Sequence, residues 1–495
     1  MKLVAGLLVL AACTVANAQP APDPDAAPPV DAGAPVEPPP ADPPASPEQI
    51  HAAGNGDTSS SVQGAPRPNQ ESGRVDPIDT GDGTWRLIGR GLLWIPRLPF
   101  EIVLFPIRGI VYLGERYHAI RTVTEIFTTD DHKFALYPSA LIETGFGLNV
   151  GVRGRMKNVL GGNESLHVRG ALGGQYLWTA AAGLDSGTLL GPVSASLDGI
   201  YAQRDREHFY GYGNADKAVA PAMQVDPLVD SGIESRYRIK VARAVLSVKV
   251  ALPDGVSVTA SSALEDKDYG ADSPDLNSPG LGAVYQTDRV PGFAQGTQYS
   301  YNELEVAYDT RRQADIWDAP GIRGTGGLSL AYFGVQHPID DGPSFFRVGV
   351  DLQRYVRLDR GPRALQFRLW GEAVTGPRDK VPFSELPRLG GENLLRGYDV
   401  DRFRDRAAIV AQAGYSWAAA NWLAPVLFVD VGRVFSGIND LSFSHPRVGF
   451  GFALEAYSSR GLLLRAQIAS SIDGGLFLFL SFNPAFDAQA RVERY

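Results

Sequence analysis

Apolar and polar residues alternate with a period of two from about Phe134 almost to the C-terminus, and this pattern most constrains the fold. Leu304, Val306 and Tyr308, for example, are separated by single charged or small residues. Successive side chains of a β-strand point to opposite faces, so each such segment has one apolar and one polar face. The sequence therefore predicts an all-β protein.

Alternation by itself fits both a soluble sandwich and a membrane barrel, in which the apolar face points outward. Many segments run for 10 to 15 residues, whereas a tilted membrane strand needs about 9–11 and soluble strands are most often about 5–6 long. Tight turns at 253–255 and 360–362 alternate with long polar loops at 265–298 and 377–404. These features favour a transmembrane antiparallel β-barrel.

The number of strands follows from counting the alternating segments. Fifteen fit the pattern: 134–142, 145–155, 164–179, 188–203, 234–252, 256–266, 299–311, 325–337, 345–357, 364–376, 406–417, 425–435, 447–456, 461–470 and 475–482. Single-chain bacterial barrels normally have an even number of strands. Segment 164–179 is unusually long, and 121–129 has β-branched content. We therefore predict sixteen strands within residues 134–482, with Phe477 and Phe479 facing lipid or in an interfacial aromatic girdle.

The N-terminal residues 1–18 have the features of a secretory signal peptide: an apolar run from Leu3 to Ala12 and an A-x-A cleavage site ending at Ala18. An alternative is lipoprotein processing, in which Cys13 becomes the lipidated N-terminus. Cleavage after Ala18 would leave no cysteine and hence no disulfide. Both alternatives place the mature chain outside the cytoplasm.

Residues 19–84 consist largely of Pro, Ala, Asp, Gly and Ser, and such a composition predicts a disordered tether. Residues 85–133 mix aromatic, aliphatic and Arg side chains between prolines. They predict a short helical segment, longest at about 107–127, at a membrane interface or barrel mouth or packed on protein surface. Residues 483–495 form a polar C-terminal tail.

The sequence gives little support for enzymatic, metal-binding or nucleic-acid-binding functions. The formal net charge is −9 without a basic cluster, which argues against nucleic acid. Seven scattered histidines have no metal-ligand spacing and form no defensible Ser/His/Asp set. We expect no catalytic residue, cofactor or metal, although a hydrolase site in the lumen is conceivable. We interpret the acidic stretch at 265–268 as a solvated loop rather than a calcium site.

One loop contains the candidate site: Leu389-Gly-Gly-Glu-Asn-Leu-Leu-Arg-Gly-Tyr398. An arginine beside glycine in a long loop can fold back into a barrel lumen and present its guanidinium to carboxylates. It can equally remain in an exposed loop and contact only water. A choice between the two needs an acceptor elsewhere in the chain.

Several motifs occur in a recognisable order. They are Tyr137-Pro138 with Gly145-Phe146-Gly147, Phe209 to Asn214 (FYGYGN), Tyr308 to Arg311 (YDTR), the Leu389 to Tyr398 loop, and Phe428 to Phe435 (FVDVGRVF). Over about residues 134–482 the chain resembles the barrel of the BamA/TamA superfamily, also called the bacterial surface antigen family. The resemblance implies a sixteen-stranded barrel whose sixth extracellular loop enters the lumen.

The resemblance also assigns site residues. It implies that the loop tip is Arg396, Gly397 and Tyr398, and that Asp430 receives the arginine. Strand parity agrees, because Asp430 faces inward if its neighbours Val429 and Val431 face lipid. Glu455 also faces inward, so it is a second candidate partner for Arg396 or else an ordinary wetted lumen residue.

The expected function is insertion or translocation of proteins or lipids at the outer membrane of a Gram-negative cell, with the N-terminal segment in the periplasm. The expected partners are outer-membrane lipid, lipopolysaccharide and client outer-membrane or secreted proteins. Family members with assembly roles have POTRA modules before the barrel, whereas residues 19–133 contain no such module. The alternative function is therefore a passive channel or a structural surface barrel.

Overall fold

The computed structural model describes residues 129, 133–143, 147–174, 176–272, 278–313, 323–340, 342–358, 363–417, 423–442, 444–458 and 461–482. The predicted signal peptide, tether and C-terminal tail lie outside these residues, as does the 85–133 segment except for Thr129 and Lys133. No helix among the described residues is long and apolar enough to span a membrane.

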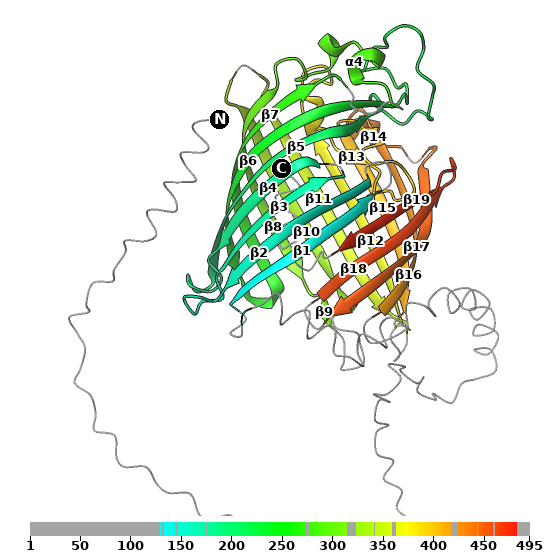
Figure 1. Ribbon diagram of the computed structural model, residues 1–495. Coiled ribbons are helices and arrows are strands. Elements are labelled where there is room, and N and C mark those ends of the chain that lie inside the picture. The colour runs from blue at the N-terminus through cyan, green and yellow to red at the C-terminus, as the bar shows by residue number, and fades with distance from the viewer. Residues whose placement is uncertain are drawn as a thin grey trace, which may run out of the picture. The chain divides into compact units, whose positions relative to one another are not determined.

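Sixteen long antiparallel strands form one sheet, so the predicted fold class and strand number are confirmed (Figure 1). In spatial order they are β1 (Phe134–Glu143), β2 (Gly147–Lys157), β3 (Ser165–Gly173), β4 (Tyr176–Asp185), β5 (Val193–Phe209), β6 (Ser235–Ala251), β7 (Val256–Gly270), β8 (Thr297–Asp309), β10 (Arg323–Pro338), β11 (Phe345–Arg357), β12 (Arg363–Val374), β15 (Ala407–Trp417), β16 (Leu423–Phe435), β17 (Arg447–Ser458), β18 (Gly461–Ser471) and β19 (Phe477–Phe482). The two-residue β9 (Arg312–Gln313) adds to the edge of β10.

The sixteenth strand arises in one of the two places that the sequence left open, the unusually long segment 164–179. The segment predicted as one strand at 164–179 is a hairpin of β3 and β4, whereas 121–129 lies outside the described residues except for Thr129, which is in no strand. β3 ends at Gly173, which pairs with Tyr176, and Gly174 follows it; their φ angles are 84° and 61°. Glycine adopts positive φ without a Cβ penalty, so the chain can reverse its direction here.

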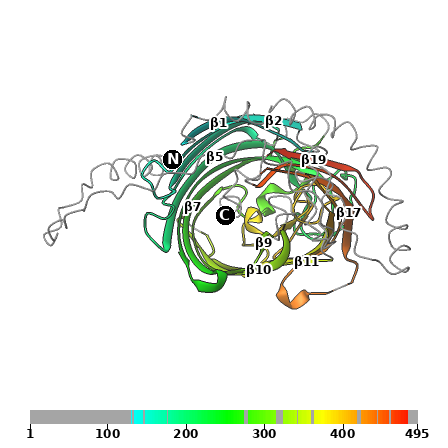
Figure 2. The same ribbon diagram turned by 90° about the horizontal axis from the view of Figure 1, so that it is seen from below.

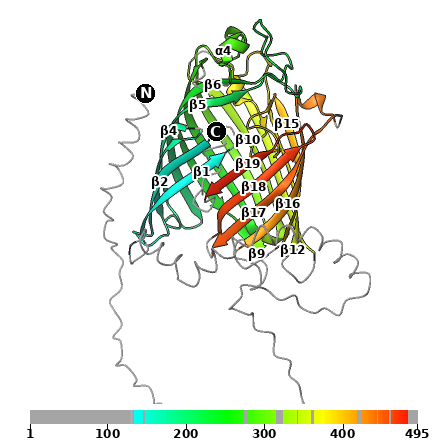
Figure 3. The same cartoon turned by 45° about the vertical axis from the view of Figure 1, so that its right-hand side comes forward.

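The sheet curls until its first and last strands meet (Figures 2 and 3). β1 and β19 pair antiparallel through only three register partners, Leu141 with Ser481, Ile142 with Leu480 and Glu143 with Phe479. By comparison, ten residue pairs join β1 to β2. The sheet is therefore not closed along its full length, and the β1–β19 junction is its shortest contact between neighbouring long strands.

The outer face of the sheet is apolar, which is the arrangement of a membrane barrel and not of a soluble sandwich. Exposed outward residues include Leu148, Val150, Val168, Leu246, Leu304, Val306, Val348, Val350, Leu369, Val429, Phe450 and Ile468. Inward neighbours such as Glu303, Glu305 and Asp430 are charged and buried. The prediction for Phe479 is wrong: Phe479 is buried and Leu478 is exposed, because strand parity turns Leu478 outward.

Long connections gather at one end of the sheet and pack on each other (Figure 1). Those after β5, β7 and β12 contribute residues to one buried apolar cluster, together with strand ends. The connection after β7 includes the short helix α4 (Leu281–Val284). The acidic stretch 265–268 is not a loop as predicted, since it lies within β7. Short turns, such as η3 (Pro253–Gly255), are at the other end.

A charge placed on the outer face should destabilise the barrel according to its depth. Leu304 is central on the outer face of β8, and Gln298 is exposed on the same face near the strand end. We expect Leu304→Arg to lower the unfolding free energy by about 2–4 kcal/mol in vesicles, and Gln298→Arg by about 0–1 kcal/mol. Denaturant titration followed by tryptophan fluorescence measures both. Equal values would contradict a lipid-facing surface.

Candidate functional site

The connection between β12 and β15, residues 375–406, folds into the barrel. Its two arms pair as β13 (Arg388–Leu389) and β14 (Phe403–Arg404), in register Arg388 with Arg404 and Leu389 with Phe403. Gly390, Gly391 and Gly397 have φ angles of 120°, 93° and 95°. L side chains rarely adopt this region, so the loop between the arms depends on glycine at these turns.

The arginine of this loop is held by a carboxylate of β16. Arg396 donates from Nε to Asp430 Oδ2 at 2.8 Å and from Nη2 to Oδ1 at 2.7 Å. The backbone N–H of Arg396 also donates to Oδ2, at 2.8 Å. Asp430 is 0% exposed. This bidentate, charge-assisted contact is the strongest hydrogen-bonding arrangement that an arginine and a carboxylate can form.

The face of the guanidinium stacks on an aromatic ring. The Cζ atom of Arg396 lies 3.5 Å from the ring centroid of Phe428, two residues before Asp430 on the same inward face of β16. The ring supplies a cation–π contact, while Asp430 binds the edge of the same group. A lysine could not satisfy both contacts because its charge is a point without a plane.

The loop tip also lies directly on the backbones of β17 and β18. A Cβ on Gly397 would lie 2.1 Å from the carbonyl oxygen of Ser470, and a Cβ on Gly449 would lie 1.6 Å from the carbonyl oxygen of Arg396. Any side chain at either position would push the tip away. Gly449 was not singled out in the sequence, because only the folded loop makes its missing side chain necessary.

The side chain of Tyr398 holds the last residue of the tip in place. Its hydroxyl donates to Asp473 Oδ2 at 3.0 Å, in the turn after β18, and its ring packs edge-on against Phe403 at 5.1 Å. Glu455 takes no part in this arrangement. Its carboxylate accepts from Arg465 Nε at 2.9 Å on β18, so the structure pairs Arg396 with Asp430 and places Glu455 in a separate contact.

Two glutamines extend the contact between the loop and the wall. Gln412 of β15 donates to the carbonyl oxygen of Asn393 at 3.1 Å, and Gln467 of β18 donates to that of Glu392 at 3.0 Å. Together with Asp430 and Gly449, these contacts attach residues 392–398 to four consecutive strands, β15 to β18. The loop is therefore a strap across the wall that leads to β19.

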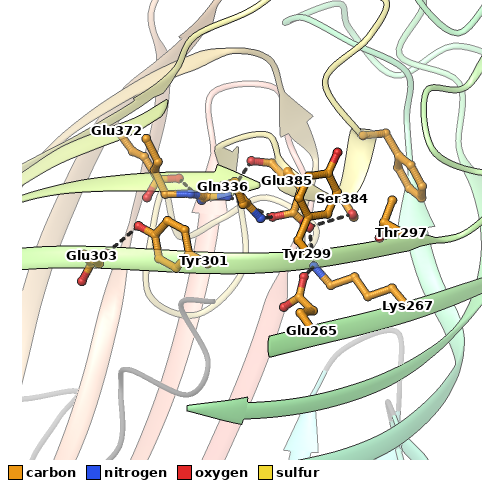
Figure 4. Close-up of polar contacts among 12 residues, drawn as sticks. Glu265, Lys267, Thr297, Tyr299, Tyr301, Glu303, Gln336, Glu372, Ser384 and Glu385 are labelled. Carbon is orange, nitrogen blue, oxygen red and sulfur yellow. Dashed lines mark hydrogen bonds and ion pairs between the residues drawn. The ribbon is translucent and has the colours of Figure 1, made fainter. Parts of the chain in front are cut away.

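A second anchor on the same connection was missed in the sequence. Glu385, at the end of η5 (Phe383–Glu385), reaches the strands on the other side of β12 from the strap (Figure 4). Its carboxylate accepts from Lys267 at 2.5 Å, Gln336 at 2.6 Å and Arg347 at 3.1 Å, on β7, β10 and β11. Arg347 also donates to Glu372 of β12 at 2.7 Å. The only signal in the sequence was a single acid in the apolar run from Val381 to Leu386.

Charge balance keeps Glu385 ionised. Burial by itself would raise the pKa of the Glu385 carboxyl, but the positive charges of Lys267 and Arg347 hold that pKa well below its usual range. A buried carboxylate is stable only when it is paired and fully hydrogen-bonded, as it is here. The two ends of the connection are thus held by two groups of strands, β7 to β11 and β15 to β18, on either side of β12.

The connection after β5 contacts both β16 and the second arm of the loop. Asn214 donates from Nδ2 to the carbonyl oxygen of Val434 at 2.8 Å and accepts from the Val434 N–H at 3.0 Å, as a neighbouring strand would. Arg404 of β14 contacts the rings of Phe209 and Phe383. Its Cζ atom is 5.4 Å from the centroid of the Phe209 ring and 5.3 Å from that of Phe383. These contacts join the FYGYGN segment to β16 and to the second arm of the arginine loop.

Removing one charge of the Arg396–Asp430 pair should lower stability more than exchanging the two charges. We expect Asp430→Asn to lower the unfolding free energy by about 3–5 kcal/mol, because the Arg396 charge loses its counterion. Exchange of the two residues, Arg396→Asp with Asp430→Arg, should recover part of the loss. Glu455→Gln is the matched control, since Glu455 does not touch the loop. Heat-dependent gel mobility of the folded barrel measures the effect, and equal single and double defects would refute the pairing.

Gly449→Ala should displace the loop without changing any charge. The new Cβ would overlap the carbonyl oxygen of Arg396. We expect faster proteolysis within residues 392–398 than in the unmodified barrel. Gly414→Ala on β15 is the control, because its Cβ would meet no atom closer than 3.6 Å. Identical cleavage of both variants would contradict the packing of the tip.

Acid should release the Glu385 anchor only well below the usual carboxyl pKa. Because the folded-state pKa is lowered, the stabilisation is complete above the unfolded value of 4.5 and is lost as pH falls through the folded value. Planar-bilayer conductance of the native barrel should stay constant from pH 7 down to pH 4.5 and increase only well below that value. Glu385→Gln should show no such transition, and a native transition above pH 5 would refute the assignment.

Comparisons with known proteins agree with this architecture. Residues 158–473 match the Omp85 superfamily domain. No curated protein matches the chain. Among solved structures, Haemophilus ducreyi BamA lacking POTRA domains 1–3 is similar, with 14% identity, a TM-score of 0.50, and 70% of this chain and 69% of that chain covered.

Two CdiB structures are also similar, but at lower TM-scores. Acinetobacter baumannii CdiB has 14% identity and a TM-score of 0.42, with 71% of this chain and 60% of that chain covered. Escherichia coli CdiB has 12% identity and a TM-score of 0.46, with 70% and 62% covered. The domain match covers more than half of the chain and lies within the sixteen-stranded sheet. This protein therefore belongs to the Omp85 superfamily and is an outer-membrane β-barrel.

Proposed function

We propose that this barrel inserts or translocates client proteins at the outer membrane by separating β1 from β19. The observation that carries the proposal is the three-residue pairing at this junction. Separation here would break fewer strand-pairing contacts than at any other junction between neighbouring long strands. Residues 134–140 of β1 have no partner on the β19 side within the described part of the chain. An unpaired edge of this kind is a template for another strand.

The strap supports the proposal because it braces one side of the junction. Arg396, Gly397 and Tyr398 attach the loop to β16, β17 and the turn after β18, whereas β19 contacts the rest of the sheet through six pairs with β18 and three with β1. The wall up to β18 would stay rigid while β19 moves. The loop would thus act as the fixed support for an opening at the junction.

Membership of the Omp85 superfamily supports the same function, since its members act on client outer-membrane or secreted proteins. The clients proposed here are such proteins. Lipid and lipopolysaccharide would surround the apolar outer face. The short-turn end, where β1 begins, would face the periplasm together with the N-terminal segment, because bacterial barrels keep short turns on that side.

A reversible lock of the junction tests the proposal. Cysteines replacing the register partners Ile142 and Leu480 would cross-link β1 to β19, in a chain whose Cys13 is replaced by alanine. We expect the oxidised protein in liposomes to stop accelerating the folding of an added client barrel, and reductant to restore the activity. The control lock joins Phe452 to Ile468 between β17 and β18 and should leave the activity unchanged.

The channel alternative predicts another pattern in the same material. A passive channel would conduct equally with the junction locked or free, and it would have no effect on client folding. Deletion of residues 377–404 would increase conductance under both functions, because it removes the strap from the lumen. Client folding that continues at full rate with the junction oxidised would therefore reject the proposal.

A further inference from the structure

The outer face of β10 has a run of small residues where neighbouring strands have large ones. Gly327, Ser329 and Ala331 occupy successive outward positions, followed by Phe333. A hollow of about 660 Å³ extends over this face from β8 to β16 and includes Gly327 and Ser329. Gly327 and Ser329 therefore line this hollow in the lipid-facing surface, and Ala331 continues the row of small side chains, called the groove below, along β10.

Large apolar residues on the adjacent strands form the walls. Ser329 is in register with Tyr308 of β8 and Leu352 of β11, and Ala331 is in register with Val306 and Val350 of the same strands. All four wall residues are exposed on the outer face. The row of small side chains along β10 thus has larger apolar residues on both sides, and Tyr308 and Leu352 also line the hollow.

A pair of stacked rings ends the groove toward the long loops. Phe333 of β10 and Phe346 of β11 lie 5.5 Å apart at an interplanar angle of 25°. Gly327 to Ala331 spans four residue steps, or roughly 13 Å along the strand. Half of a bilayer hydrocarbon core is about 15 Å thick. The groove therefore has the length of most of one acyl chain.

A cation lies at the opposite end of the groove. Arg354 of β11 is directly across from Gly327, and its Cδ would be 3.6 Å from a Cβ at that position. Arg354 is exposed on the outer face and, among the residues that the structure describes, has no hydrogen-bond or ion-pair partner. An arginine on a lipid-facing strand extends its charge toward the interface and needs an anion there.

We propose that this groove binds one anionic phospholipid of the periplasmic leaflet. Its phosphate accepts from the Arg354 guanidinium, and one acyl chain lies along Gly327, Ser329 and Ala331 up to Phe333. Arg354 is near the short-turn end of β11, which the orientation proposed above places at the periplasmic side. A guanidinium binds phosphate through paired hydrogen bonds, so the headgroup is fixed in orientation as well as charge.

The position of the groove gives the lipid a structural role. β10 is the ninth of the sixteen long strands, so it lies across the ring from the β1–β19 junction. On the inner face, β10 and β11 bind the Glu385 anchor through Gln336 and Arg347. A lipid outside and a loop inside would thus stiffen the wall that stays in place when the junction opens.

Native mass spectrometry of the full chain, purified with equimolar phosphatidylglycerol and phosphatidylcholine, tests the proposal. We expect one phosphatidylglycerol to remain bound to the native protein. Arg354→Gln should reduce its occupancy about tenfold, because a charged hydrogen bond is lost. Ala331→Leu should reduce it similarly by filling the groove while keeping the charge.

Matched variants separate this site from general lipid contact. Lys240→Gln removes another exposed cation from the outward face of β6, and Ala180→Leu enlarges an exposed outward residue of β4; both should retain the lipid. Equal occupancy in every variant would mean annular lipid only, and retention by Ala331→Leu would mean that the groove is empty of acyl chain. Equal binding of phosphatidylcholine, or displacement by inorganic phosphate, would also overturn the proposal. Heat-dependent gel mobility verifies that each variant is folded.

Discussion

The contact between Arg396 and Asp430 is the interaction on which the interior of this barrel depends. A fully buried carboxylate on a membrane strand is unstable without a counterion, and Asp430 receives three hydrogen bonds from one residue of a distant loop. The stack on Phe428 and the close approach to Gly449 then fix the position of the tip. The Asp430 charge, the Phe428 ring and the absence of a side chain at Gly449 together specify one position of the tip.

The strap and the Glu385 anchor make the connection after β12 a brace between two walls of the lumen. One end binds β7, β10 and β11 through Glu385, and the other binds β15 to β18 through residues 392–398. The β1–β19 junction has no comparable contact among the described residues and is joined by three residue pairs. Rigidity is thus concentrated away from the junction, as a barrel that opens there would require.

The differences between sequence and structure have local causes. The β3–β4 hairpin was interpreted as one strand because Gly173-Gly174 interrupts the alternation for only two residues. Residues 265–268 were interpreted as a loop because charges there were assumed to be solvated, whereas Glu265 and Lys267 face a lumen that pairs them. Phe479 was assigned to lipid from its residue type, although parity points it inward. For residues 265–268 and Phe479, composition was given more weight than periodicity.

The sequence by itself determined the all-β class, the outward apolar and inward polar faces and the inward position of Asp430, because a strand reverses its side chains at every residue. It also identified Arg396 as a candidate for the lumen. Only the tertiary structure decided that Asp430 and not Glu455 binds Arg396, that Glu385 reaches Lys267, and that β1 meets β19 over three residues. These contacts join residues far apart in the chain, and their formation depends on the path of a long loop and the closure of a sixteen-stranded sheet, neither of which leaves a local pattern.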